Sequence, residues 1–296
     1  MKTIQLPSAA LAQALGVKDV YLKREDQHKY GSQKGRSLPV MVKKYFKENG
    51  RTKFVISSSG NAALAAIHAV QVHNRNNSSV LKLKIFVGQK ISPHKLKLLL
   101  STINDANISL EQVDQARRTA QRFAQTNDHQ NLRQSNDDTA LLGYFELAQE
   151  LDKIPNLGAI FIPTSSGTTA QGLGEAFLSG QLSTHPQIHI VQTTACHPLA
   201  KDLCPYSVTP TPASLANAIV DNIGLRKNRL TEIINQTQGG AWIVTDEEIK
   251  KAQELVKETC NLVISPNSAL AIAGLKKARE CGREFPQPIC CLITGL

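Results

Sequence analysis

Three short stretches of the chain carry side chains that could react with a carbonyl group or hold an anion. The first is Gly31-Ser32-Gln33-Lys34-Gly35-Arg36, which lies between a strand-like and a helix-like pattern. A lysine in the first turn of a helix feels the positive end of the helix dipole, which favours the neutral, nucleophilic amine. Such an amine suits Schiff-base chemistry. Without the rest of the chain, however, this stretch fits an exposed surface lysine better.

The second stretch is Ser57-Ser58-Ser59-Gly60-Asn61-Ala62-Ala63, directly after the apolar run Lys53-Phe54-Val55-Ile56. Hydroxyls, a glycine and backbone amides at the start of a helix form a natural cradle for a carboxylate. An ordinary helix cap with a serine-rich turn would look similar, so the pattern alone does not decide between the two.

The third stretch runs from Pro163 to Gly172, with the sequence PTSSGTTAQG, and again lies between a strand and a helix pattern. Its glycines allow close backbone approach, and its hydroxyls and amides suit a phosphate group. It lacks the Gly-x-x-x-x-Gly-Lys-Ser/Thr order of a nucleotide P-loop. The prediction is a phosphate site, with a tight turn as the alternative.

Strand-like and helix-like patterns alternate along the chain. The strand patterns cover Val20–Leu22, Phe54–Ile56, Leu83–Val87, Ala159–Ile162, Ile188–Gln192, Trp242–Val244 and Ile289–Ile293. The helix patterns cover Leu38–Glu48, Ala62–Asn74, Leu110–Gln125, Thr139–Leu151, Ala170–Leu178, Asp246–Cys260 and Ser268–Glu280. Strands separated by helix-length segments predict a parallel α/β sheet covered on both faces. Ligands of such sheets bind beyond the carboxyl ends of the strands, where all three stretches lie.

Length, composition and charge narrow the class of protein. With 296 residues and 41% hydrophobic content, the chain can bury a sizeable core. It has no apolar run near the roughly 18 residues of a membrane span and no signal-peptide core, so we expect a cytoplasmic protein. The net charge of +10 comes with little aromatic interleaving and no nucleic-acid motif, which favours solvated faces over a nucleic-acid partner. The six cysteines have irregular spacing, so we expect no metal site.

Taken in chain order, these stretches resemble the fold-type II pyridoxal-phosphate-dependent enzymes. The segment VYLKREDQHKYGSQKGR is similar to the strand, loop and cofactor-lysine segment of that family. SSSGNAA is similar to its Ser/Thr-Gly-Asn loop, and PTSSGTTAQGL to its glycine-rich phosphate loop. IVTDEEIKKA and ISPNSALAIAGLKKA resemble the segment before its final strand, and CCLITGL resembles that strand with its hydroxyl residue. Each motif is weak alone, and the order of all five carries the resemblance.

The resemblance implies a role for each matching residue. Lys34 would hold pyridoxal 5′-phosphate as a Schiff base and carry the α-proton of the substrate. The other cofactor-binding residues would be Asn61 at the 3′ oxygen, Ser165, Ser166, Gly167, Thr168 and Thr169 at the phosphate, and Thr294 at the pyridine nitrogen. Ser58, Ser59 and Gly60 would bind the substrate carboxylate. A neutral hydroxyl beside the pyridine nitrogen suits elimination and replacement chemistry.

Within the family, the chain resembles threonine synthase through TPASLANAIVDNIG and the final Leu-Ile-Thr-Gly. It departs at Asn136–Gly143, which lacks the arginine that threonine synthases often carry there, and at Gln33 and Gly35, where the family has Phe and Asp. The predicted function is a lyase or synthase acting at Cβ or Cγ of an amino acid. A serine/threonine dehydratase-type deaminase and a non-catalytic cofactor-binding relative stay open as alternatives.

The resemblance also implies an architecture of two open, mainly parallel α/β domains with the cofactor in the cleft. A smaller mobile domain at 27–138 would hold the carboxylate loop. Residues 1–26 and 139–296 would form the larger cofactor-binding domain. The expected substrate is a small-molecule amino acid, and a homodimer is an assembly that the resemblance allows.

Overall fold

The structure is a computed structural model, and it describes residues 2–295. The chain divides into two compact units. The larger unit combines the chain up to His28 with the chain from Tyr144 onward, and the smaller unit is Lys29–Gly143. The sequence-based boundaries at 27 and 138 lie close to these two points. That the smaller unit moves stays a prediction.

The larger unit is built on a sheet that, within residues 2–295, has six strands in the order β1-β2-β10-β7-β8-β9. These strands are β1 (Gln5–Pro7), β2 (Val20–Arg24), β7 (Ala159–Pro163), β8 (Gln187–Thr193), β9 (Gly240–Val244) and β10 (Ile289–Ile293). β1 runs antiparallel to β2, and every other neighbouring pair is parallel. The last strand along the chain, β10, therefore lies between β2 and β7, so the carboxyl ends of these three strands are neighbours.

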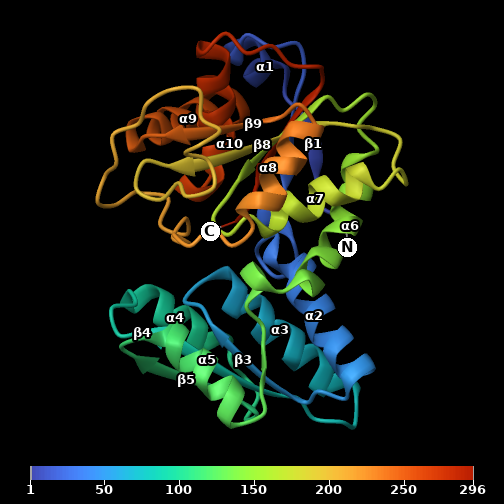
Figure 1. The fold of residues 1–296 in the computed structure, drawn as a ribbon, viewed down its shortest axis with the longest axis vertical. Helices are drawn as coiled ribbons and strands as arrows, with labels where there is room; N and C mark the ends of the chain where they lie inside the picture. Colours follow the sequence, from blue (N-terminus) through green and yellow to red (C-terminus); the bar gives the residue numbers. More distant parts are fainter. Residues whose placement is uncertain (1, 296) are drawn as a thin grey trace. The chain divides into compact units, whose positions relative to one another are not determined.

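Helices cover both faces of this sheet, as Figure 1 shows. On one face lie α1 (Ala9–Leu15), α9 (Asp246–Cys260) and α10 (Pro266–Glu280). On the other face lie α6 (Phe145–Leu151), α7 (Thr168–Leu178) and α8 (Lys227–Gln236). Side chains alternate along a strand, so Phe161 of β7 joins the first core and Ile160 joins the second. Because both faces are covered, every residue of β7, β8 and β10 is buried.

The smaller unit contains a sheet with the order β5-β4-β3-β6, and its described strands all run parallel. The strands are β3 (Lys53–Ser57), β4 (Lys82–Gly88), β5 (Ile108–Val113) and β6 (Gln130–Asn131). One core is formed with α2 (Lys34–Asn49), α3 (Asn61–Asn76) and α4 (Pro93–Thr102), and a smaller one with α5 (Ala116–Thr126). Three 3-10 helices, η1 (Glu25–Gln27), η2 (Gln134–Asn136) and η3 (Asp138–Tyr144), lie at or near the two points where the chain passes between the units.

The structure confirms the predicted strands and corrects two of the predicted helices. The segment Leu110–Gln125 is not one helix, because its first residues belong to β5, which pairs with β4. Apolar residues at helical spacing were misleading there, since pairing with a neighbouring strand overrides local preference. The segment Thr139–Leu151 begins as the 3-10 helix η3, and its α-helical part starts only at Phe145.

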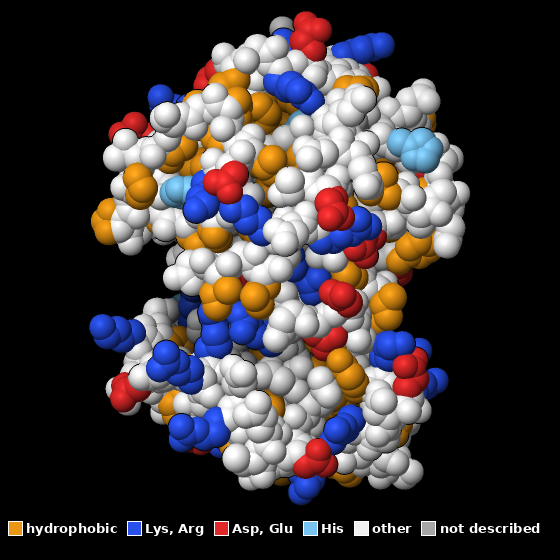
Figure 2. Space-filling model, viewed as in Figure 1, with side chains coloured by type: hydrophobic (Ala, Val, Ile, Leu, Met, Phe, Trp, Pro, Cys, Tyr) orange, Lys and Arg blue, Asp and Glu red, His pale blue; other side chains and the backbone are white. Residues whose placement is uncertain are grey.

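Charged side chains are spread over both units. On the face in Figure 2, Lys and Arg side chains lie over each unit, and many have an Asp or Glu beside them. Partly exposed ion pairs include Arg229 with Glu175 at 3.2 Å and Lys84 with Glu111 at 2.8 Å. Among residues 2–295, no helix has the length and apolar character needed to cross a membrane.

The larger sheet contains a buried aromatic cluster around His189. The ring of Phe161 stacks on the imidazole with centroids 4.6 Å apart. Trp242 Nε1 donates to His189 Nδ1 at 3.2 Å, and His189 Nε2 lies 3.1 Å from Gln187 Oε1. A neutral ring protonated on Nε2 satisfies both contacts, because one nitrogen accepts and the other donates. Burial, and to a smaller extent the charge of Arg283, lowers the pKa of His189 to about 3.

We expect acid to destabilise the larger unit through His189. An unfolded imidazole has a pKa of about 6.5, so between that pH and about 3 the unfolded chain binds one more proton than the folded chain. Through this group alone, the free energy of unfolding should fall by about 1.4 kcal/mol per pH unit as the pH decreases below about 6.5. Urea unfolding followed by the fluorescence of Trp242, the single tryptophan, measures this slope.

The variant His189→Gln should give a slope that is shallower by this amount between about pH 6 and pH 4, whatever its stability at neutral pH. The matched control is His185→Gln, at an exposed position two residues before β8, which should keep the slope of the unchanged protein. Equal slopes for His189→Gln and the unchanged protein would show that His189 is not the group responsible.

Candidate functional site

The loop between β7 and α7 has the features of an anion site. Its turn residue, Gly167, is the N-cap of α7 and has a φ of +85°. A glycine has no side chain to cap the first-turn amides of the helix, so these amides and the positive end of the helix dipole can act on a bound anion. The hydroxyls of Ser166 and Thr168 lie on either side of Gly167 in the sequence and are 2.9 Å apart.

Packing, as well as backbone conformation, requires glycine at this turn. A Cβ on Gly167 would lie 2.4 Å from Cδ1 of Leu230 and 3.2 Å from Cδ1 of Leu199, and both leucines are buried. About two turns further along α7, a Cβ on Gly174 would lie 2.3 Å from Cγ2 of Ile233. The start of α7 is therefore pressed against α8, and its position is fixed by that contact.

A buried glutamine in β8 holds the beginning of the same loop. Gln192 Nε2 donates to the carbonyl oxygens of Thr164 at 3.2 Å and Ser165 at 3.4 Å. Its Oε1 accepts from the amides of Leu199 and Ala200, both at 2.9 Å. Gln192 was given no role from the sequence, because a polar residue near the end of a strand that already contains Gln187 and His189 is not a distinctive signal.

Ser165 was predicted to bind the cofactor, and its hydroxyl oxygen already has two partners. Ser165 Oγ accepts from the amides of Val220 at 3.0 Å and Asp221 at 3.2 Å. Both amides belong to the TPASLANAIVDNIG segment, so this serine ties that segment to the loop. With both lone pairs in use, Ser165 has only its hydroxyl proton to offer to a ligand. Its role toward the cofactor stays a prediction.

Thr294 follows β10 directly and is buried. The next residue is held by α10, because Ser265 Oγ donates to the carbonyl oxygen of Gly295 at 2.6 Å and the amide of Gly295 donates to Ser268 Oγ at 3.3 Å. Both serines come from the ISPNS motif, and Ser265 is also the N-cap of α10. Because β10 pairs with β7, Thr294 and the Gly167 turn both follow the carboxyl ends of neighbouring strands.

In the smaller unit, Lys34 is the first residue of α2 and is half-buried. Two contacts hold the first turn of this helix. Ser37 Oγ donates to the carbonyl oxygen of Ala140 at 2.8 Å. Gly143 approaches so closely that a Cβ on it would lie 2.2 Å from the carbonyl oxygen of Arg36. The segment in which the sequence analysis noted a missing arginine therefore positions the helix that carries Lys34.

The loop before Lys34 is anchored on α3. The ring of Tyr30 stacks on the imidazole of His68, with centroids 5.0 Å apart and planes 9° apart. Gly31, with a φ of +74°, then turns the chain toward α2. Burial, followed by the charge of Arg75, lowers the pKa of His68, which favours the neutral ring in this stack.

The predicted carboxylate residues lie together at the start of α3. Gly60 is the N-cap of this helix, and its amide donates to Ser58 Oγ at 3.3 Å. A Cβ on Gly60 would meet nothing within 4 Å, so a ligand has room there. Ser59 and Asn61 are half-buried on either side of it. The amides of a helix start with open space beside them suit a carboxylate.

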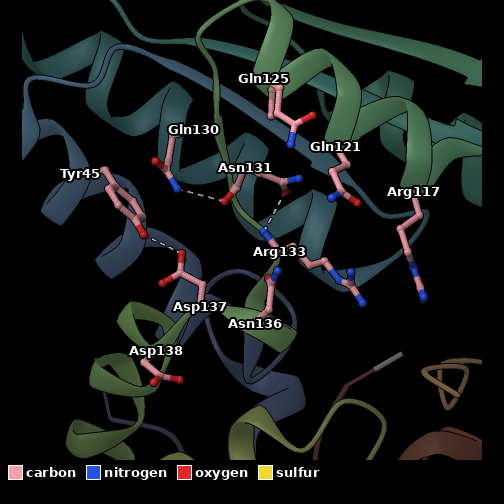
Figure 3. A pocket seen from close by; sticks show the side chains of 11 residues that line it. Tyr45, Arg117, Gln121, Gln125, Gln130, Asn131, Arg133, Asn136, Asp137 and Asp138 are labelled. Carbon is pink, nitrogen blue, oxygen red and sulfur yellow. Dashed lines mark hydrogen bonds between the residues drawn. The ribbon is translucent and has the colours of Figure 1, made fainter. Parts of the chain in front are cut away.

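The smaller unit also contains a polar cavity of about 410 Å³, shown in Figure 3. Side chains of α5 point into it, and its lining includes Arg117, Arg133 and Asp137. Tyr45 donates to Asp137 Oδ2 at 2.8 Å across one side of it. Within residues 2–295, its lining contains none of the predicted site residues. Tyr45 comes eleven residues after Lys34 on α2, about 16 Å further along the helix axis.

Comparison with known proteins decides the family. The family model for pyridoxal-phosphate dependent enzymes matches residues 2–295. The chain belongs to this family. The threonine synthase of Methanocaldococcus jannaschii is 28% identical in an alignment of 306 positions, which covers 96% of this chain and 72% of that protein. The serine racemase of Rattus norvegicus is 25% identical in an alignment of 304 positions, which covers 98% of this chain and 86% of that protein.

Solved structures share the fold of this pyridoxal-phosphate enzyme. Maize serine racemase matches with a TM-score of 0.80 at 17% identity, covering 100% of this chain and 88% of that one. The processed form of threonine deaminase isoform 2 from Solanum lycopersicum matches with a TM-score of 0.79 at 17% identity, covering 100% of this chain and 84% of that one. The predicted family, α/β fold class and cofactor are thus confirmed.

The residues present fit pyridoxal phosphate. The larger unit offers a helix start at Gly167, where amides and hydroxyls can hold a phosphate. The smaller unit offers Lys34, a half-buried amine at a helix start, for attachment of an aldehyde. Each predicted role for an individual residue remains a prediction.

Replacing the turn glycine should weaken cofactor binding. In Gly167→Ala, the new methyl group meets Leu230 and the backbone is strained by its positive φ, so the start of α7 must shift. We expect the free energy of unfolding to fall by about 2 kcal/mol and the dissociation constant of pyridoxal phosphate to rise by about tenfold. Urea unfolding and absorbance titration of the cofactor-free protein measure the two effects.

Gly180→Ala is the matched control, because Gly180 also has a positive φ, of +73°, but a Cβ there meets nothing within 4 Å. It should lose about 1 kcal/mol of stability and keep its affinity for the cofactor. If both variants bound pyridoxal phosphate equally well, the Gly167 turn would not be its phosphate site.

Proposed function

We propose that this protein is a pyridoxal-phosphate-dependent lyase or synthase that eliminates or replaces a substituent at Cβ or Cγ of an amino acid, in the manner of threonine synthase. The main support is the match to the family over residues 2–295, with Lys34 at the start of α2 and the buried hydroxyl residue Thr294 after β10. Similarity to threonine synthases over 96% of the chain supports the choice of reaction.

When bound, pyridoxal phosphate withdraws electrons from the α-carbon of an amino acid, so that the α-proton and a leaving group at Cβ or Cγ can depart. In the proposed site, Lys34 Nζ would hold the cofactor and would carry the α-proton of the substrate. The contacts of Ser37 and Gly143 support this role, because they fix the first turn of α2 and so restrict where Nζ can reach.

The start of α3 would bind the substrate carboxylate. The amides beside Gly60, with the hydroxyls of Ser58 and Ser59, neutralise this charge and orient the α-carbon. Asn61, the first residue of the helix, would bind the 3′ oxygen of the cofactor ring. One helix start would thus align substrate with cofactor, which matters because a misplaced α-proton cannot reach Lys34.

The larger unit would hold the cofactor by its two ends. The amides and hydroxyls of Ser166–Thr169 would bind its phosphate at the positive end of α7. Thr294 would place a neutral hydroxyl at the pyridine nitrogen and leave that nitrogen largely unprotonated, which suits elimination and replacement. Neighbouring strands β7 and β10 set the spacing between these two contacts.

Racemisation and deamination are alternative reactions that have support of their own. The chain is 25% identical to the serine racemase of Rattus norvegicus over 98% of its length, and its fold matches a threonine deaminase. Racemisation and deamination begin with the same removal of an α-proton, so the residues proposed above would serve all three reactions. The fate of the substrate after that step distinguishes them.

The test is to incubate the cofactor-loaded protein in deuterated water with serine, threonine and phosphohomoserine and to follow α-proton exchange and products. We expect exchange together with loss of the leaving group. Lys34→Ala should lower both by at least about a hundredfold, since proton transfer by a positioned side chain contributes at least that much. Lys43→Ala, at an exposed position of the same helix, should leave both unchanged.

The products then decide the reaction. Phosphate release with threonine formation supports the synthase, and ketoacid formed without an added nucleophile supports the deaminase. Exchange that yields only the mirror-image amino acid supports a racemase. Tight cofactor binding without exchange on any amino acid would make the protein a non-catalytic relative, and full exchange in Lys34→Ala would remove Lys34 from the mechanism.

A further inference from the structure

A buried arginine lies against the turn proposed to hold the cofactor phosphate. Arg226, the N-cap residue of α8, is only 5% exposed. Its Cβ lies 3.4 Å from the position that a Cβ on Gly167 would occupy. Leu230, one helical turn later, packs on the same side of the turn. No sequence motif indicates Arg226, because it becomes a neighbour of Gly167 only when α8 packs on α7.

The guanidinium is hydrogen-bonded to a side chain from the first turn of α7. Arg226 Nη1 donates to Gln171 Oε1 at 2.8 Å, and Gln171 is the fourth residue of that helix. The amide of Gln171 is itself oriented, because its Nε2 donates to Glu175 Oε1 at 2.9 Å. Gln171 is also buried, at 5% exposure. The positive charge is therefore held in one place by a packed side chain.

Two positive features thus meet at one end of α7. The first-turn amides carry the partial positive charge of the helix, and the guanidinium of Arg226 carries a full charge in a poorly solvated position. They repel each other, and both attract an anion. A dianionic phosphate at the Gly167 turn would be stabilised by both, more strongly than by amides alone.

We propose that Arg226 supplies a fixed positive charge to the cofactor phosphate and makes this chain select the phosphorylated form of pyridoxal. The inference rests on the proposed role of Ser166–Thr169 as the phosphate loop. It predicts that removing this charge weakens binding of pyridoxal phosphate but not of pyridoxal, which lacks the phosphate. A merely structural role of Arg226 would weaken both to the same extent.

The experiment titrates cofactor-free protein with pyridoxal phosphate and separately with pyridoxal, using the absorbance of the bound aldehyde. Arg226→Gln should raise the dissociation constant of pyridoxal phosphate by about 10- to 100-fold and change that of pyridoxal by less than about twofold. Arg229→Gln is the matched control, because Arg229 lies on the same helix but is exposed and paired with Glu175 and Glu232. It should bind both compounds as the unchanged protein does.

Arg226→Lys keeps one charge, so it should recover part of the affinity for pyridoxal phosphate, and it serves as the test if Arg226→Gln does not fold. In that case we expect Arg226→Lys to lose affinity for pyridoxal phosphate by about threefold or more and to keep its affinity for pyridoxal. Equal losses for both compounds, or no loss, would overturn the role of Arg226. If Ser166→Ala and Gly167→Ala still weaken pyridoxal phosphate binding, only this inference fails. If these two variants also have no effect, the assignment of Ser166–Thr169 as the phosphate loop is wrong as well.

Discussion

The carboxyl ends of parallel strands all lie on the same side of their sheet, and this constraint decides where ligand-binding residues can gather. In the larger unit, the order β2-β10-β7 places Thr294 and the Gly167 turn after neighbouring strands. In the smaller unit, the end of β3 leads directly to Gly60 at the start of α3. In each sheet, a helix that directly follows a parallel strand presents its first amides and its positive dipole end beside the carboxyl ends of the strands, which favours anionic ligands.

The predicted site residues are held in place by close contacts that tolerate little change. Gly167 lies against Leu230, and Gly143 lies against the backbone of Arg36. In both cases a helix start is located by an approach that only a glycine allows, to the buried side chain of Leu230 in the first case and to backbone atoms in the second. The buried side-chain amide of Gln192 adds to this, because it ties the loop between β7 and α7 to the segment after β8.

The sequence predicted the strands and the order of the motifs well, because apolar runs and strand-to-helix turns are local features. It failed where distant contacts decide, as in Leu110–Gln125, where pairing with β4 makes a strand from apolar spacing typical of a helix. It also did not identify Gln192 or Arg226, whose roles arise only when α7, α8 and β8 pack together. The ISPNS motif was recognised by resemblance, and the structure gives its physical reason, since Ser265 and Ser268 hold the residue after Thr294.

One lysine at a helix start and one phosphate loop are proposed to serve the same cofactor. A crystal structure of the protein with pyridoxal phosphate tests it most directly. We expect continuous density from Lys34 Nζ to the cofactor and a phosphate within about 3 Å of the amides of Thr168 and Thr169. A cofactor joined to another lysine, or a phosphate bound away from the start of α7, would contradict it.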